Sequence, residues 1–280
     1  MENGGKKIKR IRLYSCGCCV NNLSVVFRKH RYEKRQFPAL SVLIEHEDFG
    51  NVLYDTGYSG LIYKNHIVSF IYNMLNPTYV KEEDLITNKL KKDSIDPLLI
   101  NNVILSHAHP DHIGGLKLLK NYRIISTKQV LHTLKYGNAF QLVFKNMVPD
   151  KDVTYMAVKP AADYSVEAGE LAAYFGKVYD VLGDGSILGI ELNGHAKGQL
   201  GIYIPEMRIL FAADACWGRD LVPEIRRMRL IPRLVQNDFA EYMRTNKKFY
   251  RFSKAHPEVK IIYFHGAMKE RCYESDDKCT

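Results

Sequence analysis

The segment 106–115, SHAHPDHIGG, concentrates side chains that bind divalent metals. It contains His107, His109, Asp111 and His112 directly after a short apolar stretch. Neutral imidazole and carboxylate are ligands that zinc and similar cations prefer. Because His107 and His109 are two residues apart on an extended segment, their side chains point the same way. The segment is therefore predicted to supply several ligands from one strand-to-helix loop.

Three further ligand-type residues follow apolar stretches in the second half of the chain. They are His195 in LNGHAKG, Asp214 in ILFAADA and His265 in IIYFHGA. Each precedes small residues, so each is predicted to project from the same sheet edge. The remaining histidines lack this context and are expected to be surface or packing residues: His30, His46, His66, His132 and His256.

The elements that would position these residues are strands and helices in similar order in both halves. Strands are predicted at Ile8–Tyr14, Ala39–Glu45, Asn51–Asp55, Val103–Leu105, Arg123–Ser126, Lys177–Leu182, Ile187–Leu192, Leu200–Ile204, Arg208–Ala213 and Val259–Phe264. Helical segments are predicted at Leu61–Leu75, Lys81–Lys92, Gly115–Lys120 and Pro232–Ala255. This order predicts two βα halves packed face to face in a single domain over residues 1–280.

The composition excludes several classes of protein. Hydrophobic residues make up 46% and charged residues 25% of 280, as in ordinary globular proteins. No apolar run reaches the roughly 18 residues of a membrane span, and the N-terminus lacks the apolar segment of a secretory signal. We therefore expect a cytoplasmic protein with no membrane partner. The net charge of +9 is concentrated at Lys6–Arg12, Arg28–Arg35 and Arg226–Arg233. Since no aromatic–basic nucleic-acid module accompanies it, we expect a solvated basic surface and no nucleic-acid partner.

The six cysteines do not form a disulfide framework for a chain of this size. The cluster Cys16-Gly17-Cys18-Cys19 is compatible with a soft-metal or redox site. Without a second cysteine cluster, small residues lining a tight loop are the preferred interpretation.

Taken together, these motifs resemble the metallo-β-lactamase superfamily across most of the chain. The resemblance is carried by His107-x-His109-x-Asp111-His112, then His195, Asp214 and His265, and by Asp55 in VLYDTG. It implies an α/β fold, a four-layer αβ/βα sandwich, with a dinuclear metal site at the sheet edge. The implied first metal is held by His107, His109 and His195, and the second by Asp111, His112 and His265. Asp214 would bridge them, and Asp55 would orient a ligand or its loop.

The resemblance implies a hydrolase that uses two divalent cations. Two such cations lower the pKa of a shared water, which can then attack a carbonyl or phosphoryl centre. Zinc is expected, with iron or manganese as alternatives, because the His/Asp set accepts all three. Asp111 could take or relay a proton, and no nucleophile elbow is present.

Differences from several branches of this superfamily indicate which branch the chain resembles most. True β-lactamases usually carry Arg at the position of His112 and Cys at the position of Asp214. Enzymes similar to glyoxalase II carry a helical domain after the last histidine, whereas fifteen residues follow His265 here. The layout is most similar to the lactonase-like branch, which includes N-acyl-homoserine lactonases. That branch implies a small-molecule substrate with an acyl group and allows a homodimer.

Trp217 occupies a position at which the lactonase-like branch typically has a tyrosine that holds the substrate carbonyl. Its indole N–H can donate a hydrogen bond but supplies no phenolic proton. A substrate-contacting role for Trp217 and a packing role over the site therefore both remain open.

The expected pocket wall is apolar and rich in aromatic residues. Its candidates are Tyr58, Ile62, Tyr63, Phe70, Ile71, Phe140 and Phe144. With the basic stretch Arg226–Arg233, this wall would suit an acyl chain that has an anionic or carrier-linked end. An acyl thioester is therefore the alternative to a lactone. A phosphodiesterase or nuclease and a non-catalytic metal-bound regulator are weaker alternatives.

Overall fold

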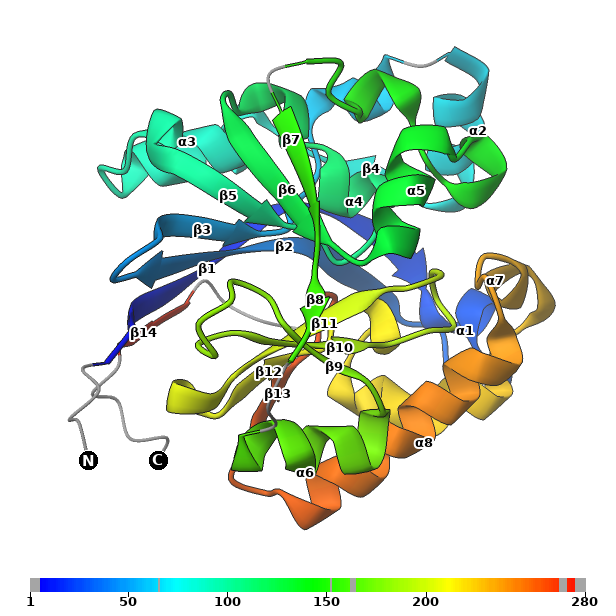
Figure 1. Cartoon of the computed structure of the whole chain (residues 1–280). Coiled ribbons are helices and arrows are strands. Elements are labelled where there is room, and N and C mark those ends of the chain that lie inside the picture. The colour runs from blue at the N-terminus through cyan, green and yellow to red at the C-terminus, as the bar shows by residue number, and fades with distance from the viewer. Residues whose placement is uncertain (1–5, 65, 152, 162–164, 267–270, 275–280) are drawn as a thin grey trace.

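The computed structural model describes residues 6–64, 66–151, 153–161, 165–266 and 271–274, which form two β-sheets packed face to face (Figure 1). The first sheet contains β1 (Ile8–Asn22), β2 (Lys34–His46), β3 (Gly50–Tyr54), β4 (Thr78–Tyr79), β5 (Ile100–Ile104), β6 (Tyr122–Ser126), β7 (Val153–Ala157) and β14 (Arg271–Glu274). The second contains β8 (Lys159–Pro160), β9 (Val178–Asp180), β10 (Leu188–Glu191), β11 (Leu200–Ile204), β12 (Ile209–Phe211) and β13 (Lys260–Ile262). Their orders are β14-β1-β2-β3-β5-β6-β7, with β4 paired to β1, and β13-β12-β11-β10-β9-β8.

Helices cover the outer faces of both sheets. The α-helices are α1 (Leu23–Val26), α2 (His66–Leu75), α3 (Ile86–Lys92), α4 (Pro110–Ile113), α5 (Lys128–Tyr136), α6 (Val166–Phe175), α7 (Leu230–Leu234) and α8 (Phe239–Ala255). Figure 1 shows α2, α3, α4 and α5 on the side of the first sheet and α6 and α8 on that of the second. The predicted four-layer αβ/βα sandwich is confirmed.

Alternation along the strands divides the interior into layers. In β2, Val42 and Ile44 face the core between the two sheets, whereas Leu43 faces the core beneath the helices. In β5, Val103 and Ile104 divide in the same way. Because both faces are buried there, apolar residues occupy successive positions, as in Val42-Leu43-Ile44 of β2 and Val103-Ile104 of β5.

Several predicted elements have different bounds. The predicted helix Lys81–Lys92 is a 3₁₀ turn followed by α3, because Leu85 between them has an extended backbone. The predicted stretch Pro232–Ala255 divides into α7 and α8, and the Asp238 side chain caps α8 by accepting from the Glu241 N–H at 2.9 Å. The predicted helix Gly115–Lys120 is only a 3₁₀ turn at Leu116–Leu118.

The cysteine cluster lies on a strand, so the expected tight loop is wrong. Cys18 and Cys19 pair with Pro38 and Phe37 of β2, and the register shifts between Ser15 and Cys18. The bulge absorbs the extra residues while the strand continues to Asn22. Among the described residues, no metal-ligand group includes these cysteines.

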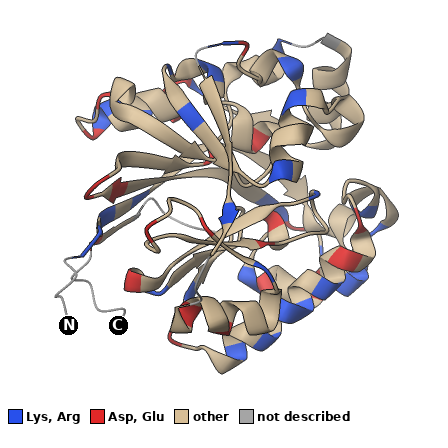
Figure 2. Ribbon diagram, in the orientation of Figure 1, with Lys and Arg blue, Asp and Glu red and all other residues tan. Residues whose placement is uncertain are grey.

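The helices are too short or too polar to cross a bilayer, as far as the described residues show. Lys and Arg are spread over the outer helices and are frequent along α8 (Figure 2).

Candidate metal centre

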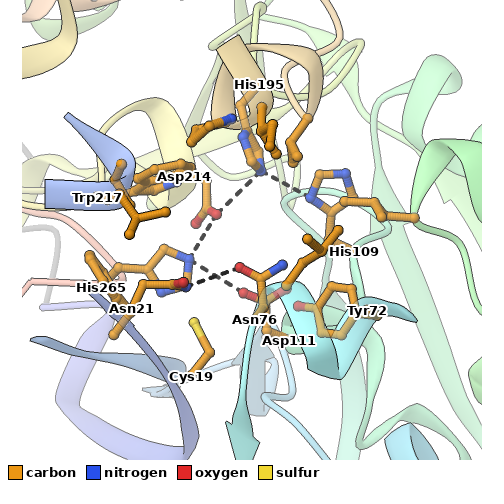
Figure 3. A pocket seen from close by; sticks show the side chains of 18 of the residues that line it. Cys19, Asn21, Tyr72, Asn76, His109, Asp111, His195, Asp214, Trp217 and His265 are labelled. Carbon is orange, nitrogen blue, oxygen red and sulfur yellow. Dashed lines mark hydrogen bonds and ion pairs between the residues drawn. The ribbon is translucent and has the colours of Figure 1, made fainter. Parts of the chain in front are cut away.

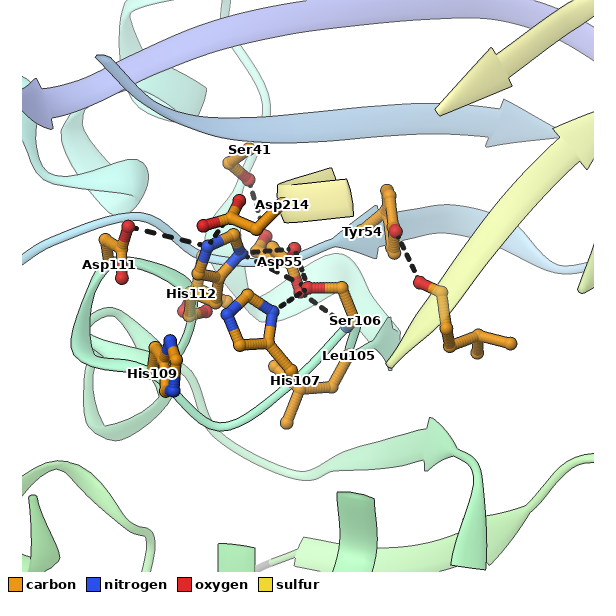
Figure 4. A network of polar contacts seen from close by, with 12 residues as sticks. Ser41, Tyr54, Asp55, Leu105, Ser106, His107, His109, Asp111, His112 and Asp214 are labelled. Carbon is orange, nitrogen blue, oxygen red and sulfur yellow. Dashed lines mark hydrogen bonds and ion pairs between the residues drawn. The ribbon is translucent and has the colours of Figure 1, made fainter. Parts of the chain in front are cut away.

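Loops from both sheets converge on one edge of the sandwich (Figure 4). Asp55 directly follows β3, and His107 and His109 follow β5, which is parallel to β3. From the second sheet, Asp214 follows β12 and His265 follows β13, again a parallel pair. The carboxyl ends of parallel strands meet at the same edge, so side chains distant in sequence become neighbours.

The predicted ligands form two adjacent groups of buried side chains. The first is His107, His109 and His195, and the second is Asp111, His112, Asp214 and His265. In each group the potential ligand atoms lie within 4.8 Å of one another. The structure therefore brings together all seven predicted ligands, divided as the resemblance implied, with Asp214 grouped with Asp111, His112 and His265.

Asp214 of the second group also reaches the first. Its Oδ2 is 2.8 Å from Nε2 of His265 and 3.3 Å from Nε2 of His195. Its Oδ1 is 3.3 Å from Nε2 of His112. One carboxylate thus reaches ligand atoms of both groups, which is the geometry that a bridging position requires.

Two histidines are oriented by the segment that carries them. His107 Nδ1 lies 2.9 Å from Ser106 Oγ, and His112 Nδ1 lies 2.7 Å from Asp55 Oδ2. Asp55 also accepts from the Ser106 N–H at 2.7 Å and from its hydroxyl at 2.6 Å. With Nδ1 occupied, the Nε2 atom of each ring faces the cluster.

Two histidines from the later strands are oriented in the same way. His195 Nδ1 is 2.8 Å from Oε1 of Gln236, whose amide nitrogen donates to the Pro232 carbonyl at 3.0 Å. His265 Nδ1 is 2.9 Å from the Pro38 carbonyl. A hydrogen bond at one ring nitrogen fixes the tautomer and leaves the other nitrogen to bind a metal, as metal-ligating histidines generally do.

The buried polar atoms fit divalent cations. Nε2 of His107, Nε2 of His112 and Oδ1 of Asp214 are buried with no hydrogen-bond partner among the described residues. Nδ1 of His109 and Nε2 of His195 lie 2.9 Å apart. Buried polar atoms are normally satisfied, so lone pairs directed at common points indicate cation sites.

The electrostatics of the cluster put some of these side chains, but not all, in the form that binds a metal. Burial, together with the charge of His195, lowers the pKa of His109 to about 3, so its ring is neutral at neutral pH. Burial alone would raise the pKa of Asp214, but the charges of His265 and His112 hold it well below its usual range. Burial opposes protonation of His265, yet the carboxylates of Asp214 and Asp111 outweigh it and raise its pKa to about 10. Neutral imidazoles and ionised carboxylates are the forms that bind metals. His109 and Asp214 already have these forms, whereas His112 and His265, whose pKa values the neighbouring carboxylates raise, would have to release a proton when a cation binds.

The backbone around the cluster is held in unusual conformations. Asp55 has φ +58°, in the left-handed region that non-glycine residues rarely adopt. A Cβ on Gly114 would lie 2.6 Å from the Gly57 carbonyl oxygen, and one on Gly115 would lie 2.7 Å from that of Thr56. The two glycines thus let the ligand-bearing loop lie against the loop that follows β3.

A cavity of about 690 Å³ opens onto the cluster (Figure 3). His109, Asp111, His195, Asp214 and His265 form its floor. Its walls are largely apolar and include Val25, Val26, Phe37, Leu75, Leu142, Trp217, Leu230, Ile231, Pro232 and Val235. Its polar wall residues include Cys19, Asn21, Ser24, Tyr58, Tyr72, Asn76 and Arg229. An apolar cavity with a few convergent polar groups is typical of a small-molecule site.

Most of the predicted wall was wrong. Tyr58 lines the cavity, but Ile62 and Phe144 are buried in the core, and Phe140 is fully exposed. Tyr63 and Phe70 line a shallower pocket elsewhere, and Ile71 is exposed. In helix α2, Tyr72 and Leu75 at its C-terminal end line the cavity instead. Single-sequence periodicity cannot say which residues of a helix that is apolar on two faces reach a cavity.

Trp217 does lie beside the cluster. Its ring packs edge-on against Phe37 at 6.3 Å, and it lines the cavity. The structure therefore combines the packing position with access to the cavity.

Sequence reasoning missed three polar residues of the site. Ser106 lies inside the quoted motif, and its position next to a ligand was a usable signal. Gln236 is 41 residues from the histidine that it orients, and Tyr72 was one of several aromatic residues in its segment. No local pattern distinguishes these two.

Comparison with known proteins agrees with the geometry. The profile of the metallo-beta-lactamase superfamily matches residues 35–249. One similar structure is an N-acyl homoserine lactone hydrolase with N-hexanoyl-L-homoserine at its catalytic metal centre (20% identity, TM-score 0.69, covering 93% of this chain and 94% of that one). Another is the dizinc quorum-quenching lactonase AidC (13%, 0.61, 93% and 91%). A third is a probable metal-dependent hydrolase from Staphylococcus aureus (14%, 0.63, 98% and 96%). No curated protein sequence matches.

The fold and the two ligand groups define a metal-dependent hydrolase with the metallo-β-lactamase fold. The chain belongs to the metallo-β-lactamase superfamily. Because the similar structures share 20% identity or less with this chain, their similarity shows the fold and nothing more.

Proposed function

We propose that the chain is a single-domain enzyme that hydrolyses an acyl ester, and that a lactone of the N-acyl-homoserine type is its substrate. The observation that carries this proposal is the apolar cavity of about 690 Å³ whose floor is the His/Asp cluster. Its size and lining suit an acyl chain, with the reacting carbonyl at the polar floor. The similarity to structures of lactonases supports the same assignment.

The chain's own residues would hold two divalent cations. His107, His109 and His195 would bind the first, Asp111, His112 and His265 the second, and Asp214 both. When bound, such cations lower the pKa of a water and polarise a carbonyl oxygen. Asp55 would keep the His112 ring in its ligating orientation through the 2.7 Å contact with Nδ1. Zinc is the proposed metal, and iron or manganese would suit the same ligands.

Tyr72 is proposed to supply the phenol that Trp217 lacks. Its hydroxyl lies 2.8 Å from that of Tyr58, and both residues line the cavity. Figure 3 shows Tyr72 beside Asp111. Burial raises the pKa of Tyr72 well above its usual value, with the charges of Asp111 and Cys19 adding to the effect, so the hydroxyl stays protonated. It can therefore donate a hydrogen bond to a substrate oxygen.

Lactone hydrolysis forms a bond from a water oxygen to the acyl carbon and breaks the ring C–O bond. The attacking water must lose a proton, and the leaving oxygen must gain one. Asp111 lies at the cavity floor and is proposed to relay that proton. Trp217 is proposed to bound the substrate on the opposite wall, with its indole N–H available to a carbonyl.

A thioester is the second candidate because Arg229 lines the cavity wall. A cation at that position would attract an acyl group joined to an anionic carrier. A neutral lactone would not need such a cation.

The test compares initial hydrolysis rates for an N-acyl homoserine lactone and an acyl-CoA with the same acyl chain, using zinc-loaded protein. We expect faster turnover of the lactone and loss of both activities in His109→Ala, with His132→Ala, on the outer face of α5, as the matched control. A preference for the thioester would transfer the proposal to the second candidate. Negligible rates for both substrates in fully metal-loaded protein would refute ester hydrolysis.

A further inference from the structure

Helix α2 exposes an apolar face to solvent. Its outward side chains are Ile67, Phe70, Ile71, Met74 and Leu75, at the i, i+3, i+4, i+7 and i+8 spacing of one helical face. Ile67 is 74% exposed and Phe70 69%. The opposite face packs inward through Val68, Ser69 and Tyr72. A helix that is apolar on both faces and buried on one leaves the outer face without a partner.

The exposed apolar surface continues on the other side of the cavity mouth. Helix α1 contributes Val25, and α7 contributes Leu230, Ile231 and Leu234, of which Leu234 is 74% exposed. Figure 1 shows α2, α1 and α7 on the same side of the molecule. We call these nine residues the apolar rim: Val25, Ile67, Phe70, Ile71, Met74, Leu75, Leu230, Ile231 and Leu234.

Backbone and side-chain contacts join the parts of the apolar rim. Asn21, just before α1, donates to Oδ1 of Asn76, just after α2, at 3.1 Å. The Arg229 N–H, just before α7, donates to the Val26 carbonyl of α1 at 2.8 Å. Four rim residues also line the cavity: Val25, Leu75, Leu230 and Ile231. The rim is therefore one surface that borders the cavity mouth.

Arginines stand beside the rim. The Arg28 N–H donates to the Arg227 carbonyl at 2.8 Å, which places the segments after α1 and before α7 side by side. Arg227 pairs with Glu224 at 3.1 Å. Arg28, Arg226 and Arg229 are exposed, and none forms an ion pair with a carboxylate of the described residues. Their charges are therefore available to an external anionic partner.

We propose that the apolar rim docks onto an anionic lipid surface, with the cavity mouth facing the lipid. Exposed aliphatic and aromatic side chains would enter the boundary of the acyl region while the arginines contact headgroup phosphates. A lipid leaflet supplies both partners at once, whereas two copies of this chain would bring like-charged arginines together. The sequence analysis predicted no membrane partner because a hydropathy search detects only long membrane-spanning segments. This surface is assembled from three short helices that are separate in the sequence.

The docking surface does not depend on the cations or on the proposed reaction. It places an acyl-sized cavity against lipid, so an apolar ligand could pass between the leaflet and the cavity without crossing water.

The experiment is co-sedimentation of the full chain with phosphatidylcholine vesicles, with and without 30% phosphatidylglycerol, at low ionic strength. We expect binding to the mixed vesicles and at least tenfold weaker partitioning of the triple variant Ile67→Ser/Phe70→Ser/Ile71→Ser. The double variant Arg28→Gln/Arg226→Gln removes two charges and should weaken binding by more than tenfold, at roughly fivefold per charge. None of these five side chains lines the cavity.

The matched control is Leu98→Ser/Leu99→Ser, which removes two exposed leucines from a 3₁₀ turn that does not border the cavity. It should bind vesicles as the parent does, and circular dichroism should show every variant folded. Absence of binding by the parent to mixed vesicles would overturn the proposal, as would equal loss in control and triple variant. A stable dimer in sedimentation velocity that the triple variant abolishes would also overturn it, because a second copy would then cover the rim.

Discussion

Replacing Asp55 by Asn tests whether the contacts behind the ligands set metal affinity. Asp55 is fully buried and accepts three hydrogen bonds, two from Ser106 and one from His112 Nδ1. Asn retains an oxygen for the Ser106 N–H but places an NH₂ where Oδ2 stood. Since that group cannot accept, His112 must turn Nδ1 into an acceptor and carry its proton on Nε2, the nitrogen that faces the cluster.

The magnitude follows from the bonds lost. A hydrogen bond to a charged group contributes about 1.5–3 kcal/mol. At 1.4 kcal/mol per factor of ten, loss of the 2.7 Å contact to His112 corresponds to roughly 10- to 100-fold in affinity for one cation. The same range is typical when a partner behind a metal ligand is removed. The other group, His107, His109 and His195, should retain its cation more tightly than the group that contains His112.

Zinc titration of metal-stripped protein against a competing chelator measures both affinities. The control is Asp96→Asn, because Asp96 accepts from the Leu98 N–H at 2.9 Å at a helix start, where Asn caps equally well. Asp55→Asn should lose affinity at one site while Asp96→Asn keeps both. Unchanged affinity at both sites in a folded Asp55→Asn protein would refute the orienting role.

Three further predictions test packing, substrate contact and surface charge. Gly114→Ala should lower the free energy of unfolding by about 1–3 kcal/mol in thermal denaturation, because its Cβ would meet backbone atoms at 2.6 and 2.7 Å. The control Gly169→Ala, with open space around it, should not destabilise the fold. Equal effects of the two substitutions would contradict the close approach at Gly114. Tyr72→Phe should lower kcat about tenfold with unchanged metal content, which a packing role alone would not do. Asp184 has a lowered pKa because its contacts with Ser186 and Lys7 outweigh burial. The ionised Asp184 carboxylate therefore stabilises the fold above the pKa that it has in the unfolded chain. This stabilisation is lost as the pH falls through the lower pKa of the folded protein. Urea unfolding should show Asp184→Asn about 1 kcal/mol less stable than the parent at pH 7. This difference in the free energy of unfolding should disappear below about pH 3.8. A difference that persists at low pH would mean that the substitution acts through side-chain geometry and not through charge.

The sequence predicted which side chains cluster better than it predicted what surrounds them. His107, His109, Asp111 and His112 share one loop, and the three later ligands each follow an apolar strand, so short-range patterns were enough. The cavity wall was not predictable in this way. Val25, Leu75 and Leu230 meet only because α1, α2 and α7 come together in the fold.

The same distinction applies to the elements. Strands β9, β10 and β11 were predicted, since apolar runs mark them locally. Helix α6 and strand β14 were not predicted. The sequence of β14 contains arginine and glutamate and has a weak local propensity to form a strand. Its antiparallel pairing with β1 holds it in the sheet, so tertiary contacts override that propensity.

The most direct test of the account is the metal content of the purified protein after equilibration with zinc and removal of excess metal. Elemental analysis should give two zinc ions per chain, falling to one in His107→Ala while circular dichroism shows the fold retained. A folded parent protein that retains no zinc, or the same content in His107→Ala as in the parent, would contradict the assignment of the two ligand groups.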